Sequence, residues 1–144
     1  MIRHGGLVAA RVGGRWLGAL IEGEAGAGKS DLALRALDHG LRLVADDRVL
    51  LWASGGRLFG RAPETLHGLI EVRGLGVVRL EPLALAEIGL LVRGATPERF
   101  PDPRTEMVAG VEVPVLALAL LEASAPAKLR RALALFDRDL KRRM

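Results

Sequence analysis

Gly23-Glu-Ala-Gly-Ala-Gly-Lys-Ser30 fits the pattern of a phosphate-binding loop, in which a glycine and four further residues precede Gly-Lys-Ser. Glycines let the backbone turn tightly enough for successive N–H groups to point at one phosphate chain. Lys29 can reach the terminal phosphates, and the Ser30 hydroxyl can ligate Mg²⁺. We therefore expect a nucleotide-phosphate cradle made of Gly23, Glu24, Ala25, Gly26, Ala27, Gly28, Lys29 and Ser30.

The residues on either side of this loop predict a strand before it and a helix after it. Residues 16–21 form a short apolar run that is typical of a buried strand. Residues 31–38 carry apolar side chains at helical spacing, and His39-Gly40 ends the pattern. Strand, glycine-rich loop and helix is the arrangement that the motif requires. This context favours a true phosphate site over a chance match in a chain with 18 glycines.

Length and composition indicate one globular domain spanning residues 1–144. Cysteine is absent, which excludes disulfides, thiolate metal ligands and a cysteine nucleophile. Aromatic residues are scarce, so base stacking is not expected and no nucleic-acid partner is predicted. The first residues lack the apolar core of a signal peptide, and the longest apolar run, 113–121, is too short to cross a bilayer. We expect a cytoplasmic protein without a membrane partner.

The net charge is +4, and its excess lies near the C-terminus. A final helix is predicted from Ala125, with one apolar face made of Leu129, Leu133, Phe136 and Leu140. The basic residues in and after this helix are Lys128, Arg130, Arg131, Arg138, Lys141, Arg142 and Arg143. A solvated helix face is the favoured interpretation of this charge. The second interpretation is that these basic residues dock onto an acidic protein or a neighbouring subunit.

The rest of the chain predicts many strands and few helices. Gly13-Gly14 indicates a hairpin between strands at 7–12 and 16–21. Further strands are expected at 41–45, 49–52, 57–59, 77–80 and 88–92, and residues 111–121 are expected to form one strand or two short ones. A helical turn is expected within 64–70, a glycine-rich loop at 71–76 and a proline-bearing loop at 96–105. A doubly wound parallel sheet would need more helices between its strands. The expected fold class is therefore α/β, with a mixed β-sheet around the P-loop helix and a C-terminal helix.

A phosphoryl-transfer site also needs a group that binds the metal and a group that orients or deprotonates the acceptor. Asp46 and Asp47 follow an apolar strand directly after the P-loop helix, so one could ligate Mg²⁺ while the other acts as base. Side chains alternate along a strand, so a shared role requires a bend at this point. Glu71 and Arg73 lie on one side of an extended chain. They could complete a metal and phosphate site, or form a structural salt bridge.

Three blocks, at 23–34, 40–47 and 69–76, resemble the catalytic domain of bacterial HPr kinase/phosphorylase in order and spacing, as does His4-Gly5. The resemblance is clear from residue 4 to about residue 80. The length and the run at 123–128 resemble the short alphaproteobacterial form, which lacks the N-terminal domain of the full-length enzyme. The resemblance implies a P-loop fold related to phosphoenolpyruvate carboxykinase. It also implies a homo-oligomer, since full-length members are hexamers.

The same resemblance implies ATP- and Mg²⁺-dependent phosphorylation of a serine on HPr, the phosphocarrier protein of the sugar phosphotransferase system. Many members also run the reverse phosphorolysis. Carried onto this chain, it implies that Lys29 contacts the transferred group and that Ser30 binds Mg²⁺. The pair Asp46 and Asp47 would supply the base, with Asp47 favoured and Asp46 left open; Asp46 is also a candidate metal ligand.

Four further residues receive roles from the resemblance. Glu71 would be a second Mg²⁺ ligand, and Arg73 lies in the loop that bears on both directions of the reaction. His4 would lie at the active site. Arg99, in Glu98-Arg99-Phe100, is the best match to an arginine that the family carries in a mobile loop.

Two departures from the family pattern affect these expectations. The chain between His4 and Gly23 is longer than usual, and the Arg-Pro-Gly-Arg type segment that follows a late Val-Pro strand is missing after residues 113–115. That segment is tied to dephosphorylation, so kinase activity is expected ahead of phosphorolysis. Two alternatives stay open. One is a P-loop kinase of a small metabolite, and the other is a nucleotide-binding regulatory module without transfer.

Overall fold

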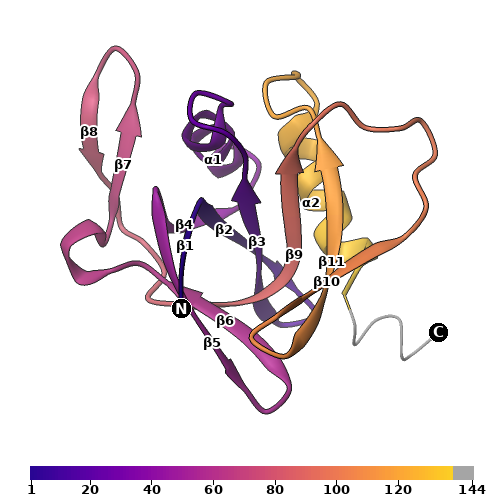
Figure 1. Ribbon diagram of the computed structural model, residues 1–144. Helices are drawn as coiled ribbons and strands as arrows, with labels where there is room; N and C mark the ends of the chain where they lie inside the picture. Colours follow the sequence, from indigo (N-terminus) through magenta and orange to yellow (C-terminus); the bar gives the residue numbers. More distant parts are fainter. Residues whose placement is uncertain (138–144) are drawn as a thin grey trace.

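The computed structural model describes residues 1–137 and consists of a curled, mixed β-sheet with two α-helices (Figure 1). Its elements, in chain order, are β1 Ile2–His4, β2 Gly6–Val12, β3 Arg15–Glu22, α1 Lys29–Leu37, β4 Arg42–Ala45, β5 Arg48–Ser54, β6 Arg57–Arg61, the 3₁₀ turn η1 Glu64–Leu66, β7 Leu69–Val72, β8 Gly76–Arg79, β9 Ala86–Gly94, β10 Arg104–Val108, β11 Val111–Leu118 and α2 Ala125–Leu135.

The main sheet has the strand order β1-β5-β6-β9-β3-β2-β4, and β11 joins it by pairing with β9. Strands β3, β9 and β11 run parallel, whereas β2 runs antiparallel to both β3 and β4. Strand β4 therefore points the same way as β3. The carboxyl ends of β3, β4, β9 and β11 consequently lie at one edge of the sheet, which is where α/β proteins place their ligands.

Two apolar clusters cover the two faces of this sheet. On one face, α1 and α2 pack through buried residues that include Leu32, Leu129 and Leu133, and the β7–β8 hairpin joins them through Ile70. On the other face, the sheet curls so that Leu7 contacts the β5–β6 hairpin; a Cβ at Gly60 would lie 2.8 Å from Leu7 Cδ2. Each fully buried leucine contributes about 2 kcal/mol to stability.

Most of the predicted elements are confirmed. The hairpin at Gly13-Gly14 is present, because β2 and β3 pair antiparallel across it, and the helix after the P-loop ends at Leu37. The mixed sheet with a P-loop helix and a C-terminal helix is the predicted fold class. The 3₁₀ turn falls within the predicted helical segment 64–70.

Two strands, β1 and β10, were not predicted, and two other segments were predicted wrongly. The loop expected at 71–76 is mostly a hairpin, because Glu71 and Val77 pair across β7 and β8. Strand β10 was not predicted, because most of its side chains are polar and prolines precede it; within residues 1–137 it is an edge strand that pairs with β11 alone. The strand expected over 111–121 ends at Leu118. Leu140 and the basic residues Arg138, Lys141, Arg142 and Arg143 lie outside the described residues.

Neither of the two α-helices within residues 1–137 is long and apolar enough to cross a bilayer. The longer one, α2, spans Ala125–Leu135, and only part of its surface is buried, against α1 and the sheet.

Candidate active site

The glycine-rich loop lies at the ligand-binding edge of the sheet, between the end of β3 and the start of α1. Gly26 and Gly28 adopt φ angles of 81° and 101°, a backbone region that side chains with a Cβ rarely enter. Helix α1 begins directly at Lys29, so its N-terminal N–H groups and the positive end of its dipole face the loop. The predicted cradle therefore has the backbone form that binds phosphate.

The Lys29 side chain folds back across this loop. Its ammonium donates hydrogen bonds to the carbonyl oxygens of Gly23 at 2.7 Å and Glu24 at 3.3 Å. The Glu24 carbonyl also accepts from the Ala27 N–H at 3.0 Å, which closes the turn. The ammonium thus lies at the mouth of the cradle, and only the half-buried Lys29 side chain has to rotate for it to meet an incoming phosphate.

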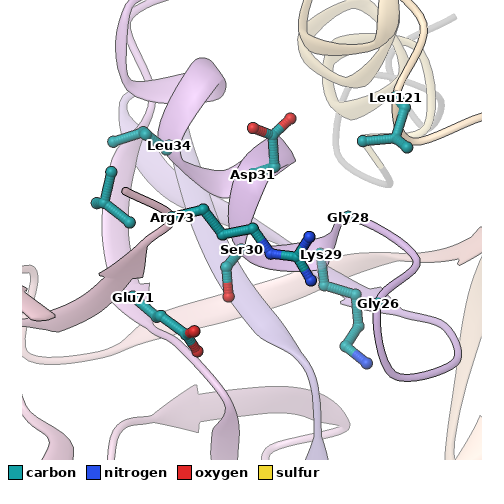
Figure 2. Close-up of a pocket in the computed structure, with 10 residues that line it drawn as sticks. Gly26, Gly28, Lys29, Ser30, Asp31, Leu34, Glu71, Arg73 and Leu121 are labelled. Carbon is teal, nitrogen blue, oxygen red and sulfur yellow. The ribbon is translucent and has the colours of Figure 1, made fainter. Parts of the chain in front are cut away.

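A cleft of about 420 Å³ opens between this loop and the β7–β8 hairpin. Figure 2 shows Ser30 and Glu71 on facing sides of the cleft, and Arg73 extending from the hairpin toward the P-loop. The lining residues are Gly26, Gly28, Lys29, Ser30, Asp31, Leu34, Glu71, Val72, Arg73 and Leu121. The cradle and the segment 71–76, which were singled out from separate stretches of sequence, therefore line one cleft.

Asp46 connects the two sides of the cleft. Its side chain is buried, with 5% of the residue exposed. One carboxylate oxygen accepts from the Ser30 hydroxyl at 2.7 Å, and the other accepts from the Glu71 backbone N–H at 3.2 Å. Both oxygens of this carboxylate are thus engaged by groups that line the cleft.

Asp47 has a different environment from its neighbour. Its φ angle is 72°, which produces the bend that the paired role required. Its side chain is 67% exposed, and Arg48 is its ion-pair partner at 3.9 Å. The bend turns Asp47 toward solvent while Asp46 stays beneath the P-loop, so the two carboxylates are separated into a buried and an accessible one.

His4 and Arg99 do not line the cleft. His4 is exposed at the end of β1, opposite Arg48 in the β1–β5 ladder, and the next residue, Gly5, donates its N–H to the Asp47 carbonyl at 3.0 Å. His4 is therefore close to Asp47 along the backbone. Arg99 lies in the loop between β9 and β10, where its guanidinium stacks on Phe100 with 5.5 Å to the ring centroid.

Leu121 lines the cleft although sequence reasoning did not select it. It follows β11 and packs against the P-loop so closely that a Cβ at Gly28 would lie 2.5 Å from Leu121 Cδ2. Arg35 of α1 holds this segment by donating to the carbonyl oxygens of Leu120 and Glu122. The contact depends on the parallel pairing of β11 with β9, and no local sequence signal indicates it.

The donor set around Asp46 is compatible with Mg²⁺. Among residues 1–137, no group of three or more His, Cys, Asp or Glu side chains gathers at metal-binding distance. A magnesium ion in a kinase site needs only one or two protein oxygens, because substrate phosphates and water complete the shell. The Ser30 hydroxyl and the carboxylates of Asp46 and Glu71 are three neighbouring oxygen donors of the kind that Mg²⁺ prefers.

The fold and the site define an α/β domain with a glycine-rich loop at a helix N-terminus, which is the form of a phosphate-binding loop. The family model described as HPr Serine kinase C-terminal domain matches residues 2–84. The chain belongs to this family, and the predicted resemblance is confirmed.

Relatives and a solved structure agree with this membership. The HPr kinase/phosphorylases of Clostridium perfringens and Clostridium beijerinckii are each 46% identical over 67 residues, which cover 46% of this chain and 22% of each relative. The matched segment thus spans about a fifth of those proteins. The Hpr(Ser) kinase/phosphatase structure from Coxiella burnetii superposes with a TM-score of 0.76 at 25% identity, covering 100% of this chain and 99% of that one.

Proposed function

We propose that this chain transfers the terminal phosphoryl group of ATP to a serine hydroxyl of an HPr-like phosphocarrier protein. The observation that carries the proposal is the double hydrogen bond of Asp46, which joins the Ser30 hydroxyl to the Glu71 N–H and so brings the cradle and the hairpin into one cleft. Family membership and the printed names of the relatives support the choice of acceptor.

In this proposal the P-loop binds the phosphates of ATP. The N–H groups at the start of α1 hold the phosphate chain, and Lys29 exchanges its two backbone carbonyls for the oxygens of the transferred group. Mg²⁺ would be held by Ser30, Asp46 and Glu71, and when bound it supplies positive charge between the phosphates. Arg73 lies on the same cleft and would compensate charge on the transferred group.

Asp47 is the proposed base. Both oxygens of Asp46 are already engaged and the side chain is buried, whereas the Asp47 carboxylate is exposed and can meet a protein acceptor. Asp47 accepts the seryl proton while the seryl oxygen bonds to phosphorus, and the bond from phosphorus to the leaving oxygen of ADP breaks. His4, held close to the Asp47 backbone, is proposed to lie on the acceptor side. The accessible position of Arg99, in the loop after β9, would suit a contact with the acceptor.

The kinase direction is proposed ahead of phosphorolysis. Residues 113–115 lie within β11, which leads directly to the short segment that holds Leu121 against the P-loop. The segment tied to dephosphorylation in the resembling enzymes has no counterpart at this point of the sequence. The wider proposal is that the chain is a single catalytic domain that acts in the cytoplasm as a homo-oligomer. Sedimentation of the purified chain would test the oligomeric state.

The direct test incubates the chain with Mg-ATP and HPr and follows phosphoserine on HPr. Lys29→Ala should lower the transfer rate by about 10²-fold or more, because the ammonium that meets the transferred group is lost. Asp38→Asn, at the exposed C-terminal end of α1, is the matched control and should behave as wild type. If wild type leaves HPr unmodified, the acceptor is wrong. ATP turnover with a small acceptor would then favour a metabolite kinase, and ATP binding without turnover a regulatory module.

A further inference from the structure

The P-loop is preceded by an ion pair that none of the site assignments uses. Glu22 is the last residue of β3, directly before Gly23. Its carboxylate accepts two hydrogen bonds from Arg3, from Nε to Oε2 at 3.0 Å and from Nη2 to Oε1 at 3.1 Å. The Glu22 side chain is only 14% exposed. A two-point pair of this kind fixes the orientation of both side chains, which a single contact does not.

Two further residues of opposite charge flank this pair. Arg93 of β9 lies opposite Glu22 in the parallel ladder and approaches its carboxylate at 3.6 Å. Glu106 of β10 pairs with Arg93 and lies 3.8 Å from Arg3. Each carboxylate thus lies between two guanidinium groups. The network links β1, β3, β9 and β10 at the ligand-binding edge of the sheet.

The position of β1 gives the Arg3–Glu22 pair its significance. In the part of the chain that the structure describes, β1 pairs with β5 alone, yet the Arg3 side chain reaches across to β3, the strand that leads into the P-loop. Two residues after Arg3, the backbone at Gly5 lies close against β3, since a Cβ at Gly5 would lie 2.5 Å from the Ile21 carbonyl oxygen. The Gly5 N–H donates to the Asp47 carbonyl at 3.0 Å. The end of β1 therefore connects the residue before the cradle to the turn that carries Asp47.

We infer that Arg3 is a positioning residue for phosphoryl transfer. Through Glu22 it holds the end of β1, and with it the Asp47 turn and His4, at a fixed place relative to the phosphate cradle. Arg3 is not among the residues that line the cleft, so it acts through the backbone that it fixes. The inference rests on the proposed function. Its physical basis is that a displacement of about 1 Å between reacting groups can cost on the order of 10²-fold in rate.

The test compares Arg3→Gln and Glu22→Gln with Arg57→Gln. The control pair, Arg57 and Glu87, has a similar separation of 3.2 Å but lies where β6 meets the start of β9, at the opposite end of that strand. Arg3→Gln and Glu22→Gln should each lower kcat for the acceptor by about 10- to 100-fold and leave the Kd of a non-transferable ATP analogue unchanged. Arg57→Gln should leave both unchanged at equal thermal stability.

Hydrogen exchange supplies a readout that needs no acceptor. Arg3→Gln should speed exchange of the Gly5 amide, which is bonded to the Asp47 carbonyl, whereas Arg57→Gln should not. Unchanged Gly5 exchange in Arg3→Gln would overturn the positioning role whether or not HPr is a substrate. Equal losses of kcat and analogue binding in all three variants would overturn it too, because they would indicate general destabilisation. If wild type does not phosphorylate HPr but Arg3→Gln speeds Gly5 exchange as expected, the proposed function is refuted. The role of Arg3 in holding the end of β1 in place would still stand.

Discussion

The Ser30 hydroxyl donates a hydrogen bond to Oδ1 of the buried Asp46 at 2.7 Å, and this contact organises the cleft. The other oxygen of the same carboxylate holds the Glu71 N–H. One side chain therefore sets both the orientation of the P-loop serine and the position of the hairpin that carries Glu71 and Arg73.

Two substitutions of Asp46 should distinguish the effect of its negative charge from the effect of its hydrogen bonds. Asp46→Ala leaves the Ser30 hydroxyl and the Glu71 N–H without their acceptor and should cost about 1–3 kcal/mol in the free energy of unfolding, measured by urea denaturation. Asp46→Asn keeps one carbonyl oxygen and should lose less stability. Both variants should need more Mg²⁺ to bind a non-transferable ATP analogue, because the metal site loses a charge. Unaltered Mg²⁺ dependence in Asp46→Asn would remove this residue from the metal site.

Gly28 and Gly26 form a matched pair of substitutions in the P-loop. Both have positive φ, so Gly26→Ala and Gly28→Ala should each introduce backbone strain of about 1–2 kcal/mol. Gly28→Ala also meets a neighbour, because its Cβ would lie 2.5 Å from Leu121 Cδ2, whereas no described residue lies within 4 Å of a Cβ built at Gly26. Gly28→Ala should therefore weaken analogue binding more in calorimetric titrations. Adding Leu121→Ala to Gly28→Ala should restore analogue affinity to that of Gly26→Ala. No recovery would mean that the Leu121 side chain can move away from the added Cβ without cost.

Arg35 should control access to the cradle from the β11 side. Its guanidinium donates to the carbonyl oxygens of Leu120 and Glu122, and so it holds Leu121 against the P-loop. Arg35→Ala should speed amide exchange in residues 119–124 and change the off-rate of the ATP analogue a few-fold. Arg130→Ala is the control, since Arg130 donates to a carbonyl at the other end of α1, that of His39, at 2.6 Å. Equal effects of the two substitutions would point to a general loosening of α1 against α2.

The curl of the sheet makes a prediction about the core. A Cβ at Gly60 would lie 2.8 Å from Leu7 Cδ2 and 3.0 Å from Val49 Cγ1. Gly60→Ala should therefore destabilise the domain by about 1–3 kcal/mol through overpacking, detected as a lower denaturation midpoint. Analogue affinity, measured on the folded fraction, should be unchanged because Gly60 is remote from the cradle. A midpoint equal to that of wild type would show that β6 can shift away from Leu7.

The local parts of the site could be predicted from the sequence. The cradle at residues 23–30 and its flanking strand and helix follow from spacing within a few residues, and the hairpin at Gly13-Gly14 follows from one glycine pair. The bend at Asp47 could be stated as a requirement. The division of Asp46 and Asp47 into a buried and an exposed carboxylate could not be predicted, because it depends on one φ angle.

Contacts between distant segments lay beyond local patterns. Leu121 meets Gly28 only because β11 runs parallel to β9 beside the P-loop strand. Arg3 meets Glu22 only because the sheet curls until β1 approaches β3. Such contacts depend on strand order, which the periodicity of a single strand does not contain.

The division of roles between the two aspartates is the central claim, and one measurement tests it most directly. Wild type and Asp47→Asn are each incubated with Mg-ATP and HPr, phosphoserine on HPr is followed by mass spectrometry, and analogue binding is measured in parallel. Phosphorylation by wild type, a rate lower by about 10²-fold or more in Asp47→Asn, and equal analogue affinity in both are the predicted results. Transfer by Asp47→Asn at the wild-type rate, or HPr left unmodified by wild type, would contradict the account.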